Sequence, residues 1–371
     1  MRDPVILHIC LSKGWGGLEM YPIKMGHQFL SAGYQVFGLC LAGTQVEAGM
    51  KTNNISLYTA NSKAHLIGTK LFSLIQWVKH HQINVIHCHK SGDLLIAALI
   101  KQFVPVKVIF TEHMGVKRSK KDFFHRWVYQ HVDQVLSISD ETYQRNLNAL
   151  PVPPEKIARL WLGTDIPEKT ELSTSELATI KQSVSLPEND FVIGTIGRIS
   201  PGKGQIELVK AFARVRQSLP HSKLVIVGGL EASQGCDLDY LAQVKQVIQS
   251  LDLTGEVIFT GFRQDTQQLL AIMDIVCLPY ANEAFGLTAI ETMAAQRPIV
   301  AANTGALPEL LESYAQYCSP TSDESIAHAI LESYEHYEEA KNNAVSARVR
   351  ACKEFSIQTH TQNLLHYYQE Q

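Results

Sequence analysis

Two basic side chains flank a glycine turn in the second half of the chain. In "RISPGKGQIELVKAF", Arg198 and Lys203 surround Gly202 and precede Gly204, just ahead of a helix that we expect to begin near Gln205. A helix N-terminus presents unpaired backbone N–H groups, while arginine offers a planar fork of donors and lysine a mobile point charge. This combination suits a diphosphate. The alternative is that both cations are solvated surface charges.

Two glutamates stand further along, in "PYANEAFGLTAIETMAAQRPIV". Glu283 precedes the start of a helix expected near Gly286, and Glu291 lies one or two turns inside it. A loop carboxylate can accept hydrogen bonds from sugar hydroxyls, the later carboxylate can reach a ribose diol, and the amides of Phe285 to Leu287 are placed for an anion. The alternatives are compensation of the helix dipole by Glu283 and an exposed helix charge at Glu291.

The stretch "LSKGWGGLEMYP", which follows the apolar run "VILHIC", is a third candidate. Gly14, Gly16 and Gly17 lie between a predicted strand and a predicted helix, and Glu19 opens that helix. The spacing is neither the dinucleotide fingerprint nor a Walker A loop. It suits a strand-to-helix turn as well as a phosphate or sugar cradle. Glu19 needs no role beyond the helix dipole.

The histidines give no metal site in this interpretation. We expect His87 and His89, which alternate in "VIHCHK", to point to opposite faces of a strand, and no D-x-D motif accompanies them. We therefore predict that no metal is essential. The charge of a bound diphosphate would be met by Arg198, Lys203 and helix dipoles.

Basic and aromatic residues gather in "GVKRSKKDFFHRWVYQHVDQV". Such a segment suits anionic lipid headgroups with its rings at the interface, so we expect it to face a membrane. The alternative is that Phe124 and Trp127, at helical spacing, belong to a core. No stacking motif accompanies the charge, so we expect no nucleic-acid partner. The basic residues are Lys117, Arg118, Lys120, Lys121 and Arg126.

Two series of alternating strands and helices would position these residues. Apolar runs such as "PVILHICL", "YQVFGLCLA" and "KVIFTEH" alternate with helix-length segments, then proline, serine and threonine concentrate in "PVPPEKIARLWLGTDIPEKTELSTSELATIKQSVSLPEND", which we interpret as the connection between domains. A second series follows with "FVIGTIGRIS", "KLVIVGG" and "IVCLPY". The pattern predicts two doubly wound α/β domains with parallel sheets, facing each other across a cleft.

Composition supports two ordinary globular domains. The 371 residues are 45% hydrophobic and 19% charged, with a net charge of -3, and no signal peptide or membrane span is evident. Residues 1 to 165 hold 18 Lys+Arg against 11 Asp+Glu, a balance of +7, and the remainder holds 15 against 25, a balance of -10. The seven scattered cysteines fit a reducing cytoplasm, and we expect Cys10, Cys88 and Cys277, in or beside apolar runs, to be small buried hydrophobes.

These phrases together resemble the retaining glycosyltransferases of family 4, which have the GT-B fold of two Rossmann-like domains. "NEAFGLTAIETMA" is similar to the family's E-x7-E signature, with Thr292 where alanine is usual, and "GRISPGKG" to its G-R-L-x-x-x-K-G. "GGLE", "NVIHCH", "TEHMG", "LGTDI", "LVIVGG", "VIFTGF" and "NTGALPELL" match in the family's order. The tail "KEFSIQTHTQNLLHYYQ" resembles the family's final helix, which implies domains of residues 1–165 plus 354–371 and 166–353.

The resemblance implies a role for each donor-side residue. Arg198 and Lys203 would clamp the diphosphate of a nucleotide sugar, Glu283 would contact hydroxyls of the donor sugar, and Glu291 would hold the ribose. The backbone amides expected to assist are those of Phe285, Gly286, Leu287 and Thr288.

In the first domain, Gly16 and Gly17 would let their loop approach the same phosphate. His113, in "TEHMG", would touch the donor sugar and would join Arg198, Lys203 and Glu283 as the catalytic set. Asp165 stands where the family often has N-G-V-D, and its role near the acceptor or hinge is open.

The implied function is sugar transfer with retention from a nucleotide sugar, UDP favoured, to a lipid-linked or lipopolysaccharide glycan. The enzyme would be a cytoplasmic hexosyl- or N-acetylhexosaminyl-transferase on the inner face of the membrane. Two alternatives stay open: a non-hydrolysing sugar-nucleotide epimerase and a non-catalytic nucleotide-sugar-binding protein. The E-x7-E phrase together with "GRISPGKG" favours transfer.

Overall fold

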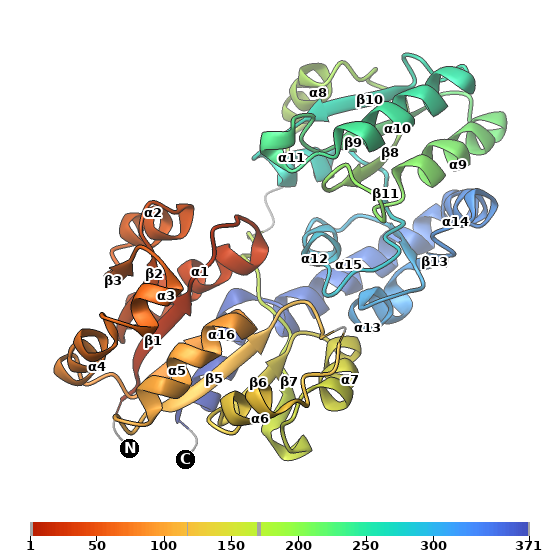
Figure 1. Ribbon diagram of the computed structural model, residues 1–371. Helices are drawn as coiled ribbons and strands as arrows, with labels where there is room; N and C mark the ends of the chain where they lie inside the picture. Colours follow the sequence, from red (N-terminus) through yellow and green to blue (C-terminus); the bar gives the residue numbers. More distant parts are fainter. Residues whose placement is uncertain (1–2, 117, 169–171, 370–371) are drawn as a thin grey trace. The chain divides into compact units, whose positions relative to one another are not determined.

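The structure is a computed structural model that describes residues 3–116, 118–168 and 172–369. The chain divides into two compact units, which we call unit 1 (1–163 with 358–371) and unit 2 (164–357). Each unit has a parallel sheet with its own hydrophobic core (Figure 1). The prediction of two doubly wound α/β domains is therefore confirmed. Thr164 pairs with Ser356 where the chain passes between the units, and Asp165 follows as an exposed residue.

Unit 1 holds a seven-stranded sheet in the order β3-β2-β1-β4-β5-β6-β7. The inner strands read as continuous apolar runs, as in "VILHIC" of β1, because helices cover both faces of such a sheet. The strands are β1 (Val5–Cys10), β2 (Gln35–Leu41), β3 (Ser56–Ala60), β4 (Val85–Cys88), β5 (Lys107–Glu112), β6 (Gln134–Ser137) and β7 (Ile157–Arg159). The helices are α1 (Gly17–Ser31), α2 (Gln45–Thr52), α3 (Lys63–Ile67), α4 (Leu71–His80), α5 (Leu94–Lys101), α6 (Phe123–Tyr129), α7 (Asp140–Ala149) and α16 (Ile357–Gln369), with the 3-10 turns η1 (Ser91–Asp93) and η2 (Pro154–Lys156).

Unit 2 holds a six-stranded sheet in the order β10-β9-β8-β11-β12-β13. Its strands are β8 (Phe191–Ile196), β9 (Ser222–Val227), β10 (Val257–Gly261), β11 (Ile275–Leu278), β12 (Ile299–Ala302) and β13 (Gln316–Cys318). Its helices are α8 (Thr174–Ser183), α9 (Gln205–Ser218), α10 (Leu238–Ser250), α11 (Thr266–Ala271), α12 (Leu287–Ala294), α13 (Leu307–Leu311), α14 (Asp323–Glu335) and α15 (Tyr337–Glu354), with η3 (Ala232–Gln234) and η4 (Glu312–Tyr314).

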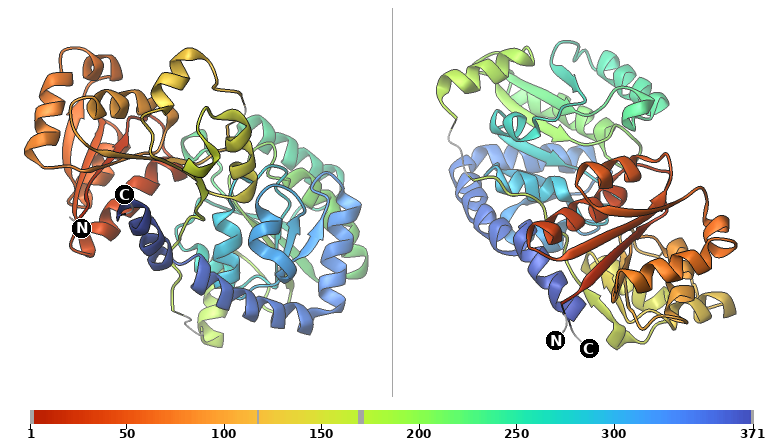
Figure 2. Two further views of the ribbon diagram at one scale, coloured as in Figure 1. Left: turned by 90° about the horizontal axis from the view of Figure 1, so that it is seen from below. Right: turned by 90° about the vertical axis from the view of Figure 1, so that its left-hand side faces the viewer.

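One feature was not predicted by the sequence analysis. The proline-rich segment interpreted as a connection contains β7, the edge strand of unit 1, and α8, whose start is fixed by a capping box of Ser173 and Glu176. The C-terminal helix α16 packs on unit 1, where the Tyr368 ring lies 5.1 Å from that of Phe29 on α1, so both ends of the described chain lie in unit 1 (Figure 2).

Candidate functional site

The loops of unit 2 that the sequence predicts to bind a donor meet where the strand order of its sheet reverses. β8 and β11 are neighbours in the sheet, but the chain continues outward from them in opposite directions. Doubly wound sheets bind ligands beyond the carboxyl ends of the two strands at such a point. Arg198 and Lys203 follow β8 and Glu283 follows β11, so these predicted residues share one edge of the sheet.

Lys203 and Glu283 form an ion pair across 80 residues of sequence. Lys203 Nζ lies 2.6 Å from Glu283 Oε2, and the two side chains keep 23% and 20% of their exposure. The ammonium also lies 4.0 Å from the centre of the Tyr280 ring, within cation–π range. The sequence analysis missed Tyr280, whose hydroxyl donates to the Ile196 carbonyl at the end of β8 and so joins the two loops.

The glycine turn after β8 is shaped by close backbone packing. Gly204 has a φ of +70°, and a Cβ there would lie 2.3 Å from the Pro279 carbonyl oxygen, so only glycine fits. The Ala281 N–H donates to the Gly202 carbonyl at 3.0 Å. Helix α9 begins at Gln205, as predicted. Of its N-terminal amides, that of Ile206 donates to the Tyr240 hydroxyl at 3.4 Å.

A third loop, after β12, holds the backbone of Glu283. The Ala306 N–H donates to the Glu283 carbonyl at 2.9 Å, and a Cβ on Gly305 would lie 2.5 Å from the same oxygen. Gly286, with a φ of +108°, caps α12, which begins at Leu287 close to the predicted start. The phrase "NTGALPELL" contains the supporting residues, but its spacing alone does not show which loop they contact.

The other donor-side residues lie on or beside α12 and β8. Phe285 is buried, so a ligand there would meet its backbone and not its ring. Leu287 is exposed, whereas Thr288 and Glu291 are half-buried on α12. Arg198 is exposed on the loop after β8. This edge of unit 2 therefore presents two cations, two carboxylates and a helix N-terminus.

The glycine loop of unit 1 lies at that unit's own reversal point, between β1 and β4. Ser12 Oγ donates to Glu19 Oε1 at 2.6 Å and accepts from Lys90 Nζ and from the Gly14 N–H, each at 3.1 Å. Glu19 is 8% exposed. It therefore anchors the loop through Ser12, in addition to its place at the start of α1.

Gly16 and Gly17 are not required by the packing of unit 1. Gly16 has a φ of 177°, an extended conformation that any residue adopts, and a Cβ there would lie 3.6 Å from Glu19 Oε2. A Cβ on Gly17 would meet nothing within 4 Å. The start of α1 thus borders open space, which is compatible with the predicted ligand cradle.

Buried histidines contradict one expectation from the sequence. The rings of His87 and His89 lie 4.2 Å apart, because residues two positions apart along a strand share a face; the expected opposite faces were wrong. Nitrogens of these two residues and of His8 lie within 4.8 Å of one another, as in a metal site. His87, however, already bonds the hydroxyls of Tyr368 at 2.6 Å and Thr111 at 2.7 Å, so an ion would have to displace one of them.

His113 follows β5 and is 8% exposed. Its Nε2 is buried and has no hydrogen-bond partner among the described residues. Burial lowers the pKa of His113 to about 3, so the imidazole is neutral near pH 7. The unpaired nitrogen of a neutral imidazole can form a hydrogen bond with a hydroxyl of a ligand.

The basic and aromatic segment forms what we call the α6 surface, defined by Arg118, Lys120, Lys121, Phe123 and Phe124. Phe123 is 88% and Phe124 53% exposed, and Arg118 and Lys121 are exposed while Lys120 is half-buried. The alternative that this segment belongs to a core is therefore wrong for Phe124 but holds for the next turn of α6, where Trp127 packs against the core of unit 1 and Val128 is part of it. Lys117 lies outside the described residues.

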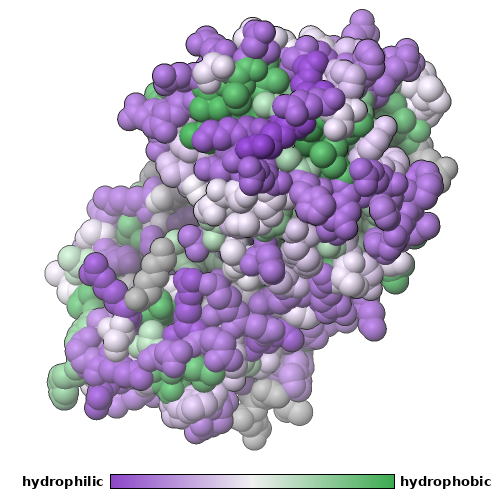
Figure 3. All heavy atoms as spheres, turned by 90° about the vertical axis from the view of Figure 1, so that its right-hand side faces the viewer, coloured by the Kyte–Doolittle hydropathy of each residue, from purple (hydrophilic) through white to green (hydrophobic). Residues whose placement is uncertain are grey.

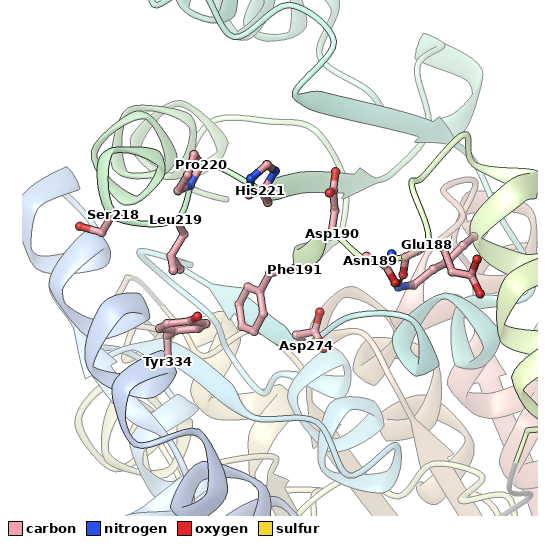
Figure 4. Close-up of a pocket in the computed structure, with 11 residues that line it drawn as sticks. Glu188, Asn189, Asp190, Phe191, Ser218, Leu219, Pro220, His221, Asp274 and Tyr334 are labelled. Atoms are coloured by element: carbon pink, nitrogen blue, oxygen red, sulfur yellow. Dashed lines mark hydrogen bonds between the residues drawn. The ribbon is translucent and has the colours of Figure 1, made fainter.

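The surface hollow drawn in Figure 4 adds no candidate site. A hollow of about 480 Å³ in unit 2 is lined by Phe191, His221 and Asp274, which stand at the amino ends of the strands, opposite to the edge that binds ligands in such sheets (Figure 4). On the face drawn in Figure 3 hydrophilic side chains predominate. Among the described residues, no helix has the length and apolarity needed to cross a bilayer.

Family models match both units. Residues 15–167 match the family described as Glycosyltransferase Family 4, and residues 178–350 match the one described as Glycosyl transferases group 1. The chain belongs to the family 4 glycosyltransferases. The resemblance noted in the sequence is thereby confirmed, and glycosyltransferase activity is the function of this family.

Relatives and solved structures agree with this assignment. An uncharacterized glycosyltransferase of Methanocaldococcus jannaschii is 24% identical over 335 residues, which cover 84% of this chain and 83% of the relative. The D-inositol 3-phosphate glycosyltransferase of Salinispora arenicola is 34% identical over 138 residues, or 35% of this chain and 30% of the relative.

Solved structures show that this glycosyltransferase has the GT-B fold. The glycosyltransferase from Rickettsia africae superposes with a TM-score of 0.89 at 20% identity, covering 99% of this chain and 98% of that chain. Anabaena HepE in complex with UDP-glucose gives a TM-score of 0.80 at 23% identity, covering 98% of each chain.

Proposed function

We propose that this glycosyltransferase moves a hexose or N-acetylhexosamine, with retention, from a UDP-sugar to a lipid-linked glycan such as that of lipopolysaccharide. The ion pair of Lys203 and Glu283 at the reversal point of unit 2 is the observation that carries the proposal. A cation for a diphosphate beside an acceptor for sugar hydroxyls is what a nucleotide sugar requires. The solved complex of HepE with UDP-glucose, a structural neighbour, supports the choice of donor.

In this proposal the two members of the ion pair contact different parts of the donor. Lys203 and Arg198 bind the diphosphate, the amides that open α12 assist them, and Glu283 accepts hydrogen bonds from sugar hydroxyls. Glu291 holds the ribose. His113 of unit 1, neutral and with Nε2 unpaired, contacts the transferred sugar, and Gly16 and Gly17 leave room for the phosphate.

The reaction exchanges one bond for another at the anomeric carbon. The bond to the diphosphate oxygen breaks as the acceptor hydroxyl bonds to the same face of the sugar, and the hydroxyl proton passes to the departing diphosphate. Lys203, Arg198 and the helix N-terminus stabilise the charge that develops on the leaving group. We propose that no metal ion is essential for this step.

The acceptor side of the proposal rests on the α6 surface. Exposed phenylalanines beside exposed cations suit an anionic membrane, where a lipid-linked acceptor would be found.

A thermal-shift screen against UDP-, GDP-, ADP- and CMP-sugars tests the donor. A ligand that binds the folded state alone stabilises it by about 2.7 kcal/mol at a hundred times its Kd, which raises the Tm of a unit of this size by about 5–10 °C. We expect UDP-sugars to give this shift, and a shift with another base alone would contradict the UDP assignment. Conversion of a UDP-sugar to its epimer without acceptor would instead indicate an epimerase.

A further inference from the structure

Tyr21 of α1 packs among four buried histidines of unit 1, of which His89 and His87 have ring centres 5.3 Å and 6.3 Å from its own. Its ring centre is 4.9 Å from that of His113, with the planes 68° apart, and 5.6 Å from that of His360, with the planes 69° apart. Tyr21 is 6% and His360 1% exposed. One buried aromatic ring thus contacts both the site histidine and a residue of the C-terminal helix α16.

The donors and acceptors of the hydrogen bonds between Tyr21, His360 and Trp161 can be assigned. His360 Nδ1 lies 2.7 Å from the Trp161 carbonyl oxygen, which only accepts, so Nδ1 carries the proton. His360 Nε2 is then an acceptor, and the Tyr21 hydroxyl donates to it at 2.7 Å. The carbonyl fixes the tautomer of His360, and His360 fixes the direction of the Tyr21 hydroxyl.

His113 itself has less support from polar contacts. Its Nε2 is buried without a partner among the described residues, and its neighbouring rings are those of Tyr21 and His89, the latter at 5.9 Å. Ring packing therefore holds the orientation of His113, and Tyr21 supplies the closer of these two contacts.

We propose that Tyr21 is a positioning residue for His113 and that His360 of α16 holds Tyr21 in place. This proposal rests on the proposed contact between His113 and the transferred sugar. Its consequence is that the C-terminal helix supports catalysis without touching substrate.

A double-mutant cycle between Tyr21 and His113 tests the proposal. Tyr21→Leu removes the ring, and misplacement of a reacting group lowers kcat on the order of tenfold to a hundredfold. We expect kcat to fall by that amount with the donor KM within about twofold. In the His113→Ala background, Tyr21→Leu should cost almost nothing further, because residues that act as a unit are non-additive.

Three further variants distinguish a positioning role of Tyr21 from a general loss of stability. Phe29→Leu removes another buried ring from α1, one that packs on Tyr34 and Tyr368, and its effect on kcat should be small and the same with or without His113. Tyr21→Phe keeps the ring but loses the bond to His360, so it should lose less kcat than Tyr21→Leu, and His360→Phe should match Tyr21→Phe.

The outcomes that overturn the proposal are distinct. Equal losses from Tyr21→Leu with and without His113 would assign Tyr21 a structural role only, as would losses that merely follow the Tm of each variant. If His113→Ala keeps full activity, the proposed role of His113 itself is wrong, and the inference about Tyr21 falls with it.

Discussion

At the scale of residues, the site in unit 2 depends on one charged pair. Lys203 is held between Glu283 Oε2 at 2.6 Å and the face of Tyr280 at 4.0 Å. These contacts place the ammonium before any ligand arrives. In the proposed function, a bound diphosphate accepts charge-assisted hydrogen bonds from the Lys203 ammonium, and the Glu283 carboxylate then accepts hydrogen bonds from sugar hydroxyls.

Replacing Lys203 should weaken nucleotide binding. A hydrogen bond to a charged group contributes about 1.5–3 kcal/mol, so we expect Lys203→Met to raise the Kd for UDP on the order of tenfold to a hundredfold, as measured by isothermal titration calorimetry. Lys210→Met, at an exposed position of α9, is the matched control and should bind UDP like the wild type. Equal Kd values for UDP in the two variants would show that Lys203 does not bind the diphosphate.

At the scale of elements, loops at the carboxyl ends of strands carry the site, and the sequence predicts them to different degrees. An apolar run followed by glycines predicted the turn after β8, and α9 starts at Gln205 as expected. Residues that are distant in sequence and in contact only in the folded unit, such as Lys203 and Tyr280, leave no pattern in the local sequence that predicts the contact. The His87 and His89 prediction failed for a geometric reason, since alternate residues of a strand share a face.

The α6 surface makes a prediction about membranes. Each Lys or Arg near an anionic surface contributes about 1 kcal/mol of binding, so Arg118→Glu with Lys121→Glu should reduce binding to phosphatidylglycerol vesicles by at least about tenfold in a sedimentation assay. Lys70→Glu with Lys79→Glu, at two exposed positions, is the control that makes the same change of net charge. If the α6-surface variant and the control variant bind vesicles equally well, this surface is not the membrane contact.

At the scale of the whole molecule, the two units differ in what they bury. Every buried histidine among the described residues belongs to unit 1: His8, His87, His89, His113 and His360. Desolvation by burial lowers the pKa of His8 and His113 to about 3 and that of His360 to about 4. In the unfolded chain histidine has its ordinary pKa of about 6.5.

Unit 1 should therefore lose stability in mild acid. Below pH 6.5 the unfolded chain binds protons that folded unit 1 does not, so its free energy of unfolding falls as the pH falls towards 4, by at most about 1.4 kcal/mol per pH unit for each histidine. Calorimetry should show two unfolding transitions, and between pH 7.5 and pH 5.5 the Tm of one should fall further than the Tm of the other. The transition whose Tm changes less should be that of unit 2, which is identified because UDP raises its Tm. Equal changes in the two Tm values would contradict this account.

The most direct test of the whole account is turnover of the donor. Wild-type protein is incubated with each UDP-sugar in buffer containing EDTA, and release of UDP is followed with Lys203→Ala and Glu283→Ala in parallel. We expect slow hydrolysis of one UDP-sugar by the wild type, unaffected by the chelator and lost in both variants. Release that persists in both variants would contradict the site, and no release from any nucleotide sugar, with or without added metal, would contradict the proposed reaction.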